Sequence, residues 1–212
     1  MNRLPKLTLA LAGACAAACT GSLFQSKAAP PTIYVLREEP ADAAPAPAGP
    51  VIPADLAVLK PRVSAGLETD RIAVLYPDRH LDFFAGARWS GPLSEVLQNA
   101  AMQELHAHAH LRTISGDASV FASAYWLEIE VWDFQAEYTA AAAPTVHVHL
   151  QARIGNSGDR QILGEFAAIA VQPAAENRLT AIVDAYARAA DAAFAQIIAH
   201  VDETLAKTSE AR

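Results

Sequence analysis

Two stretches in the second half of the chain alternate apolar and polar side chains with a period of two. They run from Ala124 to Tyr138 and from Thr145 to Ile154. Successive side chains of a β-strand point to opposite faces, so this period predicts two strands with one buried and one wet face. A third strand over Gln161–Val171 follows the turn 155–159 and completes an antiparallel meander. The side chains predicted to be buried are Leu127, Ile129, Val131, Val146, Val148, Leu150, Ala152 and Ile154.

Shorter apolar and β-branched runs predict further strands in the first half of the chain. Thr32–Leu36 is expected to be a first strand and Arg71–Tyr76 a buried one. His80–Trp89 is predicted to form short extended pieces around Gly86, and Leu111–Ser115 one more strand.

Two segments carry apolar residues at helical spacing. The first is predicted to begin after Ser90 as N-cap, with Pro92 in its first turn, and to fade over 106–110. The second covers about Ala175–Lys207. The predicted fold class is α+β: a mixed, largely antiparallel β-sheet with two main helices packed on one face, a two-layer sandwich. The helical apolar stripes are Leu93, Val96, Leu97, Ala100, Ala101 and Leu105, and Leu179, Ile182, Val183, Tyr186, Ala190, Phe194, Ile197, Ile198, Val201 and Leu205.

The N-terminus has the pattern of an export signal. Arg3 and Lys6 precede an uncharged apolar run over 7–14, and small residues follow. The run is too short to span a bilayer, which needs about 20 apolar residues. We therefore expect residues 1–18 to be a removable lipoprotein signal peptide, and no later stretch is apolar enough to cross a membrane.

The chain's two cysteines, Cys15 and Cys19, both lie at the end of this signal, so no disulfide framework is expected in the folded part. A cysteine after an apolar run and small residues resembles a bacterial lipobox, in which the thiol takes a diacylglycerol and the cysteine becomes the first residue of the mature protein. Both cysteines are candidates for this lipid. Ordinary signal cleavage after an alanine, with unmodified cysteines, is the alternative.

Composition divides the rest of the chain. Residues 19–31 are small and polar and are expected to be a flexible tether. A single domain is predicted over 32–207, with an irregular loop over 38–54 because proline is frequent there, and a disordered tail over 208–212.

Charge limits the partners. The chain has 212 residues and a net charge of −7, which argues against nucleic acid and against a basic patch for anionic lipid headgroups.

Histidines raise the question of a metal. His106, His108 and His110 are closely spaced, and imidazole suits zinc, copper or nickel. Neither a cysteine nor a clear acidic partner lies near them in sequence, and histidines at a helix end also favour the helix dipole. His147 and His149 are expected on the wet face of their strand. We therefore predict no metal and no cofactor.

Acidic residues do not indicate an enzyme. Glu128, Glu130 and Asp133 resemble a carboxylate set for acid–base work, but acids are expected on the polar face of an alternating strand. No nucleophile-elbow, phosphate-loop or dinucleotide motif occurs in the sequence. The prediction is a protein without catalytic residues.

Tryptophans are the better candidates for function. Trp126 and Trp132 are expected on the same face of their strand as its polar side chains. An aromatic residue on a wet face often marks an interface. Arg88 and Trp89, just before the first helix, are the second candidate pair. The alternatives are that a neighbouring segment covers Trp126 and Trp132, and that Trp89 is a core residue beside a surface Arg88.

A series of landmarks follows the lipobox cysteine. They are Pro30 to Leu36, Pro61-Arg62-Val63, Gly66-Leu67, Asp70 to Val74, Phe83-Phe84, Ala87-Arg88-Trp89 and Pro92-Leu93. Their order resembles the ABC-type transport auxiliary lipoprotein family, the group that includes the paraquat-inducible C lipoprotein. The resemblance covers nearly the whole mature chain and is densest over 66–105.

The lipobox departs from the family. Alanines replace the usual Leu-x-Gly before the cysteine, which leaves the acylated residue open. Thr20-Gly21-Ser22 fit the family and favour Cys19 over Cys15.

The resemblance implies a lipid-anchored accessory subunit at the outer membrane that faces the periplasm. Members work with an MCE-domain protein and its permease and ATPase, and the assembly moves phospholipid or other hydrophobic molecules between the inner and outer membranes. Thr20 and Gly21 lack the Asp that retains many lipoproteins at the inner membrane. Two matters stay open: whether the chain also forms a homo-oligomer, and the alternative of an adaptor that activates a cell-wall synthase.

Overall fold

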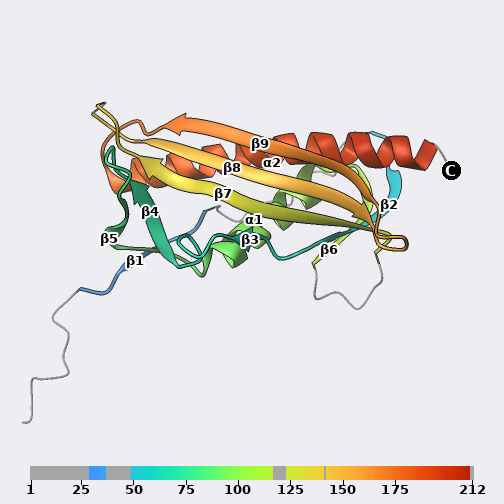
Figure 1. The fold of residues 1–212 in the computed structure, drawn as a ribbon, viewed down its shortest axis with the longest axis horizontal. Helices are drawn as coiled ribbons and strands as arrows, with labels where there is room; N and C mark the ends of the chain where they lie inside the picture. Colours follow the sequence, from blue (N-terminus) through green and yellow to red (C-terminus); the bar gives the residue numbers. More distant parts are fainter. Residues whose placement is uncertain (1–28, 37–48, 117–122, 141, 211–212) are drawn as a thin grey trace, which may run out of the picture. The chain divides into compact units, whose positions relative to one another are not determined.

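The computed structural model describes residues 29–36, 49–116, 123–140 and 142–210. The chain divides into two units at Pro31, and the account below concerns the second unit, from Pro31 onward. Its described part contains nine strands of one sheet and two helices (Figure 1). The elements are β1 (Thr32–Tyr34), β2 (Ile52–Val58), β3 (Arg62–Val63), β4 (Arg71–Leu75), β5 (Leu81–Trp89), α1 (Leu93–His108), β6 (Leu111–Gly116), β7 (Tyr125–Glu137), β8 (Thr145–Asn156), β9 (Ile162–Pro173) and α2 (Leu179–Glu210).

The meander predicted from the period-two pattern is confirmed. β7 pairs antiparallel with β8 along its whole length, and β8 pairs antiparallel with β9. All eight side chains predicted to be buried in β7 and β8 are buried. They face the layer of the two helices, which lies behind the sheet in Figure 1.

The other edge of β7 is paired in succession by three short parallel strands. β2 meets it at Leu56↔Tyr125, β3 at Arg62↔Glu130, and β4 at Val74↔Ala136. Beyond these, β6 pairs parallel with β2, β5 pairs antiparallel with β4, and β1 pairs parallel with β5. The sheet is therefore mixed but mostly antiparallel, and the predicted α+β class with two helices on one face is confirmed.

β2 begins inside the proline-rich stretch that predicted an irregular loop. Ile52, Pro53 and Ala54 are part of the strand. Pro53 is tolerated because the pairing with β6 shifts register between Ile52 and Asp55, and a bulge does not need the N–H that proline lacks. The predicted loop 38–54 is therefore wrong at its end; residues 37–48 lie outside the described part.

β5 is one strand rather than separate pieces. Its pairing with β4 passes from Arg71↔Arg88 to Ala73↔Phe83, so extra residues of β5 are accommodated in between. Gly86 lies there with φ +68, a left-handed conformation that glycine adopts at little cost. The glycine thus bends the strand without ending it.

Both helices bury the predicted stripes except for Leu179, which is half-buried, and the ends of the helices differ from prediction. No side-chain cap forms at the start of α1, where the residue in the N-cap position is Pro92, so Ser90 is not the cap. α2 begins at Leu179 and continues to Glu210. The hydroxyls of Thr208 and Ser209 donate to the carbonyls of Thr204 and Ala206, each at 2.8 Å. The tail predicted to be disordered from 208 is therefore helical as far as 210.

An aromatic cluster joins the two layers. Tyr186 of α2 lies 5.3 Å from the ring of Trp89 and 5.1 Å from that of Phe134, and it is fully buried. Its hydroxyl donates to the Ala73 carbonyl at 2.5 Å, which satisfies a polar group in the core. Burial raises the pKa of the Tyr186 hydroxyl, because the ionised form would be desolvated.

Candidate functional site

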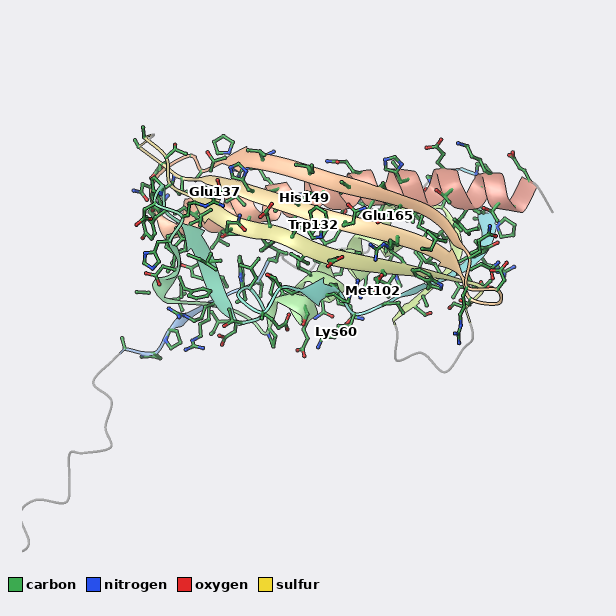
Figure 2. All side chains as sticks on the ribbon, in the orientation of Figure 1. Lys60, Met102, Trp132, Glu137, His149 and Glu165 are labelled. Carbon is green, nitrogen blue, oxygen red and sulfur yellow. The ribbon has the colours of Figure 1, made fainter. Side chains whose placement is uncertain are left out.

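The outer face of β7, β8 and β9, opposite the helices, carries large apolar side chains in water. Trp132 is 52% exposed, Ile169 53% and Val171 50%. With His147 and His149 between them on β8, they form what we call the Trp132 patch: Trp132, His147, His149, Ile169 and Val171. Figure 2 shows Trp132 and His149 close together on the side of the sheet that faces the viewer.

Strand register assembles this patch. His149 is opposite Ile169 on β9, and His147 is opposite Val171. The rings of Trp132 and His149 are tilted by 57°, with centroids 4.7 Å apart. Side chains in cross-strand contact restrict one another, so the patch presents a defined surface.

Trp132 keeps the outward direction of the regular strand, and a bulge in β7 changes the direction of the residues that follow it. Up to Val131 the odd-numbered residues face the core, and the pairing with β8 then shifts between Val131 and Asp133. After the shift the even-numbered Phe134 and Ala136 are buried instead. Bulges of this kind re-aim side chains, and here Trp132 is left on the outer face next to Asp133.

Toward the β8–β9 turn the outer face carries an ion-pair network. Arg62 of β3 pairs with Glu128 at 3.3 Å and with Glu130 at 3.6 Å. Arg153 pairs with Glu128 at 3.5 Å and with Glu165 at 3.0 Å. The hydrogen bond that Arg153 donates to Glu165 holds the pKa of Arg153 above its ordinary value. Two of the three carboxylates suspected of acid–base chemistry, Glu128 and Glu130, thus have arginine partners.

The surroundings of Trp132 are different, because the carboxylates there meet histidine and an amide. Asp133 lies 3.6 Å from His149, and Glu137 lies 3.6 Å from His147. The Gln135 side-chain nitrogen donates to both carboxylates, at 3.2 and 3.1 Å. Within the described part of the chain, neither carboxylate forms an ion pair with lysine or arginine. This half of the outer face therefore combines acidic side chains with exposed apolar ones.

Trp126 is only partly exposed and lies against β8. A Cβ built on Gly155, its partner in the register, would fall 2.1 Å from the indole Cζ2, so the ring occupies the space that glycine leaves. A hollow of about 580 Å³ opens beside it, with Ala57, Leu59 and Arg160 among its lining residues. The register thus brings Trp126 next to small neighbours, away from the Trp132 patch.

The pair Arg88 and Trp89 is split between surface and core. Trp89 is 2% exposed and belongs to the aromatic cluster, so its side chain is not available at a surface. Arg88 is exposed and pairs with Asp70 at 2.7 Å. The structure therefore has the arrangement of a core tryptophan beside a surface arginine.

The histidines near the end of α1 do not converge on one point. His108 lies 3.6 Å from Glu104, and Nδ1 of His110 donates to the Asp202 carboxylate of α2 at 2.9 Å. Among the described residues no group of three or more His, Cys, Asp or Glu side chains is placed to hold a metal ion. His106 and His110 both line a hollow beside β6.

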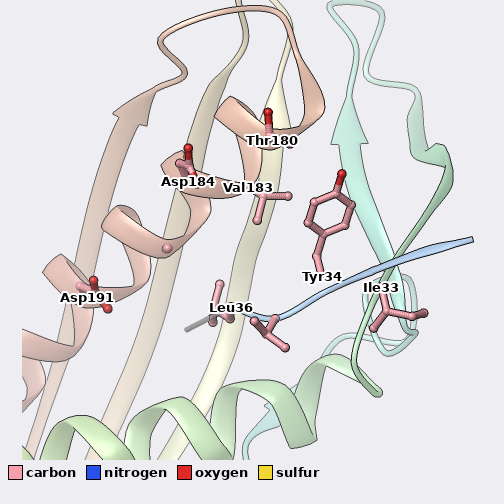
Figure 3. Close-up of a pocket in the computed structure, with 9 residues that line it drawn as sticks. Ile33, Tyr34, Leu36, Thr180, Val183, Asp184 and Asp191 are labelled. Atoms are coloured by element: carbon pink, nitrogen blue, oxygen red, sulfur yellow. The ribbon is translucent and has the colours of Figure 1, made fainter. Parts of the chain in front are cut away.

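A further cavity of about 420 Å³ lies between β1 and α2. Figure 3 shows Tyr34 and Leu36 on one side of it and Val183, Asp184 and Asp191 on the other. Apolar side chains and two carboxylates line it, without a nucleophile or base arranged for catalysis. Its position shows where the segment that follows the predicted tether meets the domain.

The predicted lipid sites, Cys19 and Cys15, lie outside the described residues. None of the helices described by the structure has the length and hydropathy needed to cross a membrane.

Ile169 and Val171 were missed by sequence reasoning. On β9 the small residues Ala168 and Ala170 face α2 and are buried, whereas the larger Ile169 and Val171 face water. The sequence does alternate small and large side chains here, with alanine at 168 and 170 and the larger residues at 169 and 171. Only the position of α2 shows which of the two alternating sets faces the core.

Comparison with solved structures shows the same fold. A crystal structure of a Xanthomonas campestris protein from the DUF330 family aligns with a TM-score of 0.74 at 21% identity, over 84% of this chain and 99% of that one. A second crystal structure, of a protein described as uncharacterized, aligns with a TM-score of 0.63 at 16% identity, over 82% of this chain and 99% of that one. No curated protein matches the sequence.

Fold and site together define a two-layer α+β domain with an aromatic–aliphatic patch on the outer face of its sheet. The family model for the ABC-type transport auxiliary lipoprotein component matches residues 34–198. The chain belongs to this family, as the order of landmarks in the sequence predicted.

Proposed function

We propose that this protein is a lipid-anchored accessory subunit, without enzymatic activity, of an MCE-type ABC transport system. In this role it is held in the outer membrane through Cys19 and faces the periplasm. It assembles with an MCE-domain protein and the associated permease and ATPase. The system moves phospholipid or other hydrophobic molecules between the two membranes.

The observation that carries the proposal is membership of a transport auxiliary lipoprotein family over most of the chain. The N-terminus supports the anchor, because a short apolar run ends in small residues and cysteine. The Trp132 patch supports a role in assembly, because exposed aromatic and aliphatic side chains gathered on one face mark interaction sites.

Affinity purification from the native envelope tests the proposal. A C-terminally tagged chain, solubilised in mild detergent, should recover an MCE-domain protein, a permease and an ATPase. Recovery of a cell-wall synthase in their place would refute the transport role.

The anchor is tested separately with matched cysteine variants. Cys19→Ser should release the protein from the membrane fraction, whereas Cys15→Ser should remain there with acyl chains on its first residue by mass spectrometry. Loss of membrane association in the Cys15→Ser variant alone would assign the lipid to Cys15.

A further inference from the structure

The outer face of β7, β8 and β9, which contains the Trp132 patch, has the size of a protein-binding surface. β7, β8 and β9 have 12 or 13 residues each. At about 3.3 Å per residue and about 4.8 Å between strands, their outer face measures about 40 by 14 Å. A standard interface buries about 800 Å² per partner. This face therefore supplies most of such an area, with Trp132 near its middle.

The charges at the patch indicate the chemistry of the partner. The side chain of Asp133 is 46% exposed and that of Glu137 28% exposed, and both retain water-facing oxygens. Trp132 adjoins Asp133 in β7, and an aromatic face attracts a lysine or arginine cation within about 6 Å. Two carboxylates and an indole on one surface are complementary to basic side chains next to an apolar one.

The same charges disfavour two other occupants. A second copy docked face to face would set Asp133 and Glu137 against each other, in a chain of net charge −7. An anionic lipid surface would be repelled for the same reason. A basic protein surface is the occupant that gains from both the charge and the apolar side chains.

β9 is an edge strand, and where it passes the patch its backbone groups are hydrogen-bonded to α2. Gln196 of α2 accepts from the Ile169 N–H at 3.2 Å and donates to the Ile169 carbonyl at 2.9 Å. Arg188 donates to the Pro173 carbonyl at 3.5 Å. An incoming strand would have to displace these bonds, so side chains on the face, not backbone at the edge, are available to a partner.

We propose that the Trp132 patch docks a partner protein that places lysine or arginine against the exposed oxygens of Asp133 and Glu137 and an apolar side chain on Trp132, Ile169 and Val171. The partner lies across the face of the sheet and does not extend β9. This inference rests on the proposed function, because the partner is the MCE-domain protein of the transport system.

The test measures the Kd of the full-length chain in detergent for the periplasmic part of the MCE-domain protein, at 50 and 200 mM NaCl. Asp133→Asn/Glu137→Gln should raise Kd about tenfold at 50 mM and less at 200 mM, because salt screens exposed charges. Trp132→Ala should raise Kd about thirtyfold at both salt concentrations. The control Glu95→Gln/Glu203→Gln, which removes the same charge from the helical layer, should stay within about twofold of wild type.

Gln196→Ala separates docking on the face from pairing at the edge. It frees both backbone groups of Ile169, so edge pairing would tighten binding, whereas face docking leaves Kd unchanged within about twofold. Tighter binding by this variant would overturn the proposal.

The remaining outcomes are also decisive. If the MCE-domain protein binds but the patch variants bind as wild type does, this inference fails and the proposed function stands. If that protein does not bind at all, both fail. Sedimentation of the chain alone identifies a second copy as the occupant if wild type self-associates and Trp132→Ala does not, which would overturn the proposal.

Discussion

Two aromatic residues of one strand, Trp132 and Phe134, should respond very differently to truncation. The register shift in β7 places them on opposite faces although they are two residues apart. Phe134 is 1% exposed and contacts the rings of Trp89 and Tyr186, whereas Trp132 is 52% exposed and contacts His149. A regular strand would give both the same face, so this pair tests the bulge.

The expected loss of stability for each substitution follows from how deeply the side chain is buried. Phe134→Ala leaves a cavity in the core and should lower the free energy of unfolding by about 3–5 kcal/mol. Trp132 covers roughly 100 Å², about half of what a buried aromatic covers. Alanine and the unfolded chain keep part of that area, so about 60 Å² is lost, worth about 1.5 kcal/mol at about 25 cal/mol per Å². Water fills the space, and no cavity term is added.

Thermal unfolding followed by far-UV circular dichroism measures the difference. For a domain of this size about 1 kcal/mol shifts Tm by about 2–4 °C. Phe134→Ala should therefore lower Tm by about 12 °C and Trp132→Ala by about 5 °C, with Trp132→Phe close to wild type. A drop for Trp132→Ala equal to or greater than that for Phe134→Ala would show that Trp132 is a core residue and refute the face assignment.

Two further predictions concern a pH dependence and a close contact. The Arg112 guanidinium donates to Asp55 between β2 and β6 and lowers the pKa of that carboxyl. The stability advantage of wild type over Asp55→Asn should therefore be complete above the unfolded-state pKa of about 3.9 and be lost as the pH falls through the lowered folded-state pKa. Urea unfolding from pH 7 to pH 2 measures this, and an unchanged difference would contradict it. Gly155→Ala should displace the Trp126 ring and shift its fluorescence to the red, and a further Trp126→Ala should add little destabilisation; full additivity of the two substitutions would argue against the contact.

Local sequence patterns predicted the structure correctly wherever one hydrophobic periodicity persisted over several helical turns or several strand residues. The buried sides of β7 up to Val131, of β8 and of both helices could be predicted from the sequence, because a long amphipathic element has one orientation that buries its apolar side. The two-layer α+β class followed from the number and order of those elements. The family was predicted from landmarks along the chain and is confirmed over residues 34–198. The exposed position of Trp132 was part of the same pattern.

Only the tertiary structure decided the rest, because it depends on neighbours distant in sequence. The short strands β2, β3 and β4 gain their pairing from β7, so Pro53 could lie in a strand once a bulge removed the need for its N–H. Trp89 is buried because Phe134 and Tyr186 meet it in the core.

β9 shows most clearly what the sequence pattern could not predict. By hydrophobicity alone Ile169 would be inside and Ala168 outside, but Ala185, Ala189 and Ala193 let α2 pack closely, and small side chains fit beneath it. The sequence by itself determined the three long strands and both helices and that Trp132 lies on the outer face. The packing distance of α2 decided that Ile169 and Val171 join Trp132 there, since the space between the layers sets which side chains they can enclose.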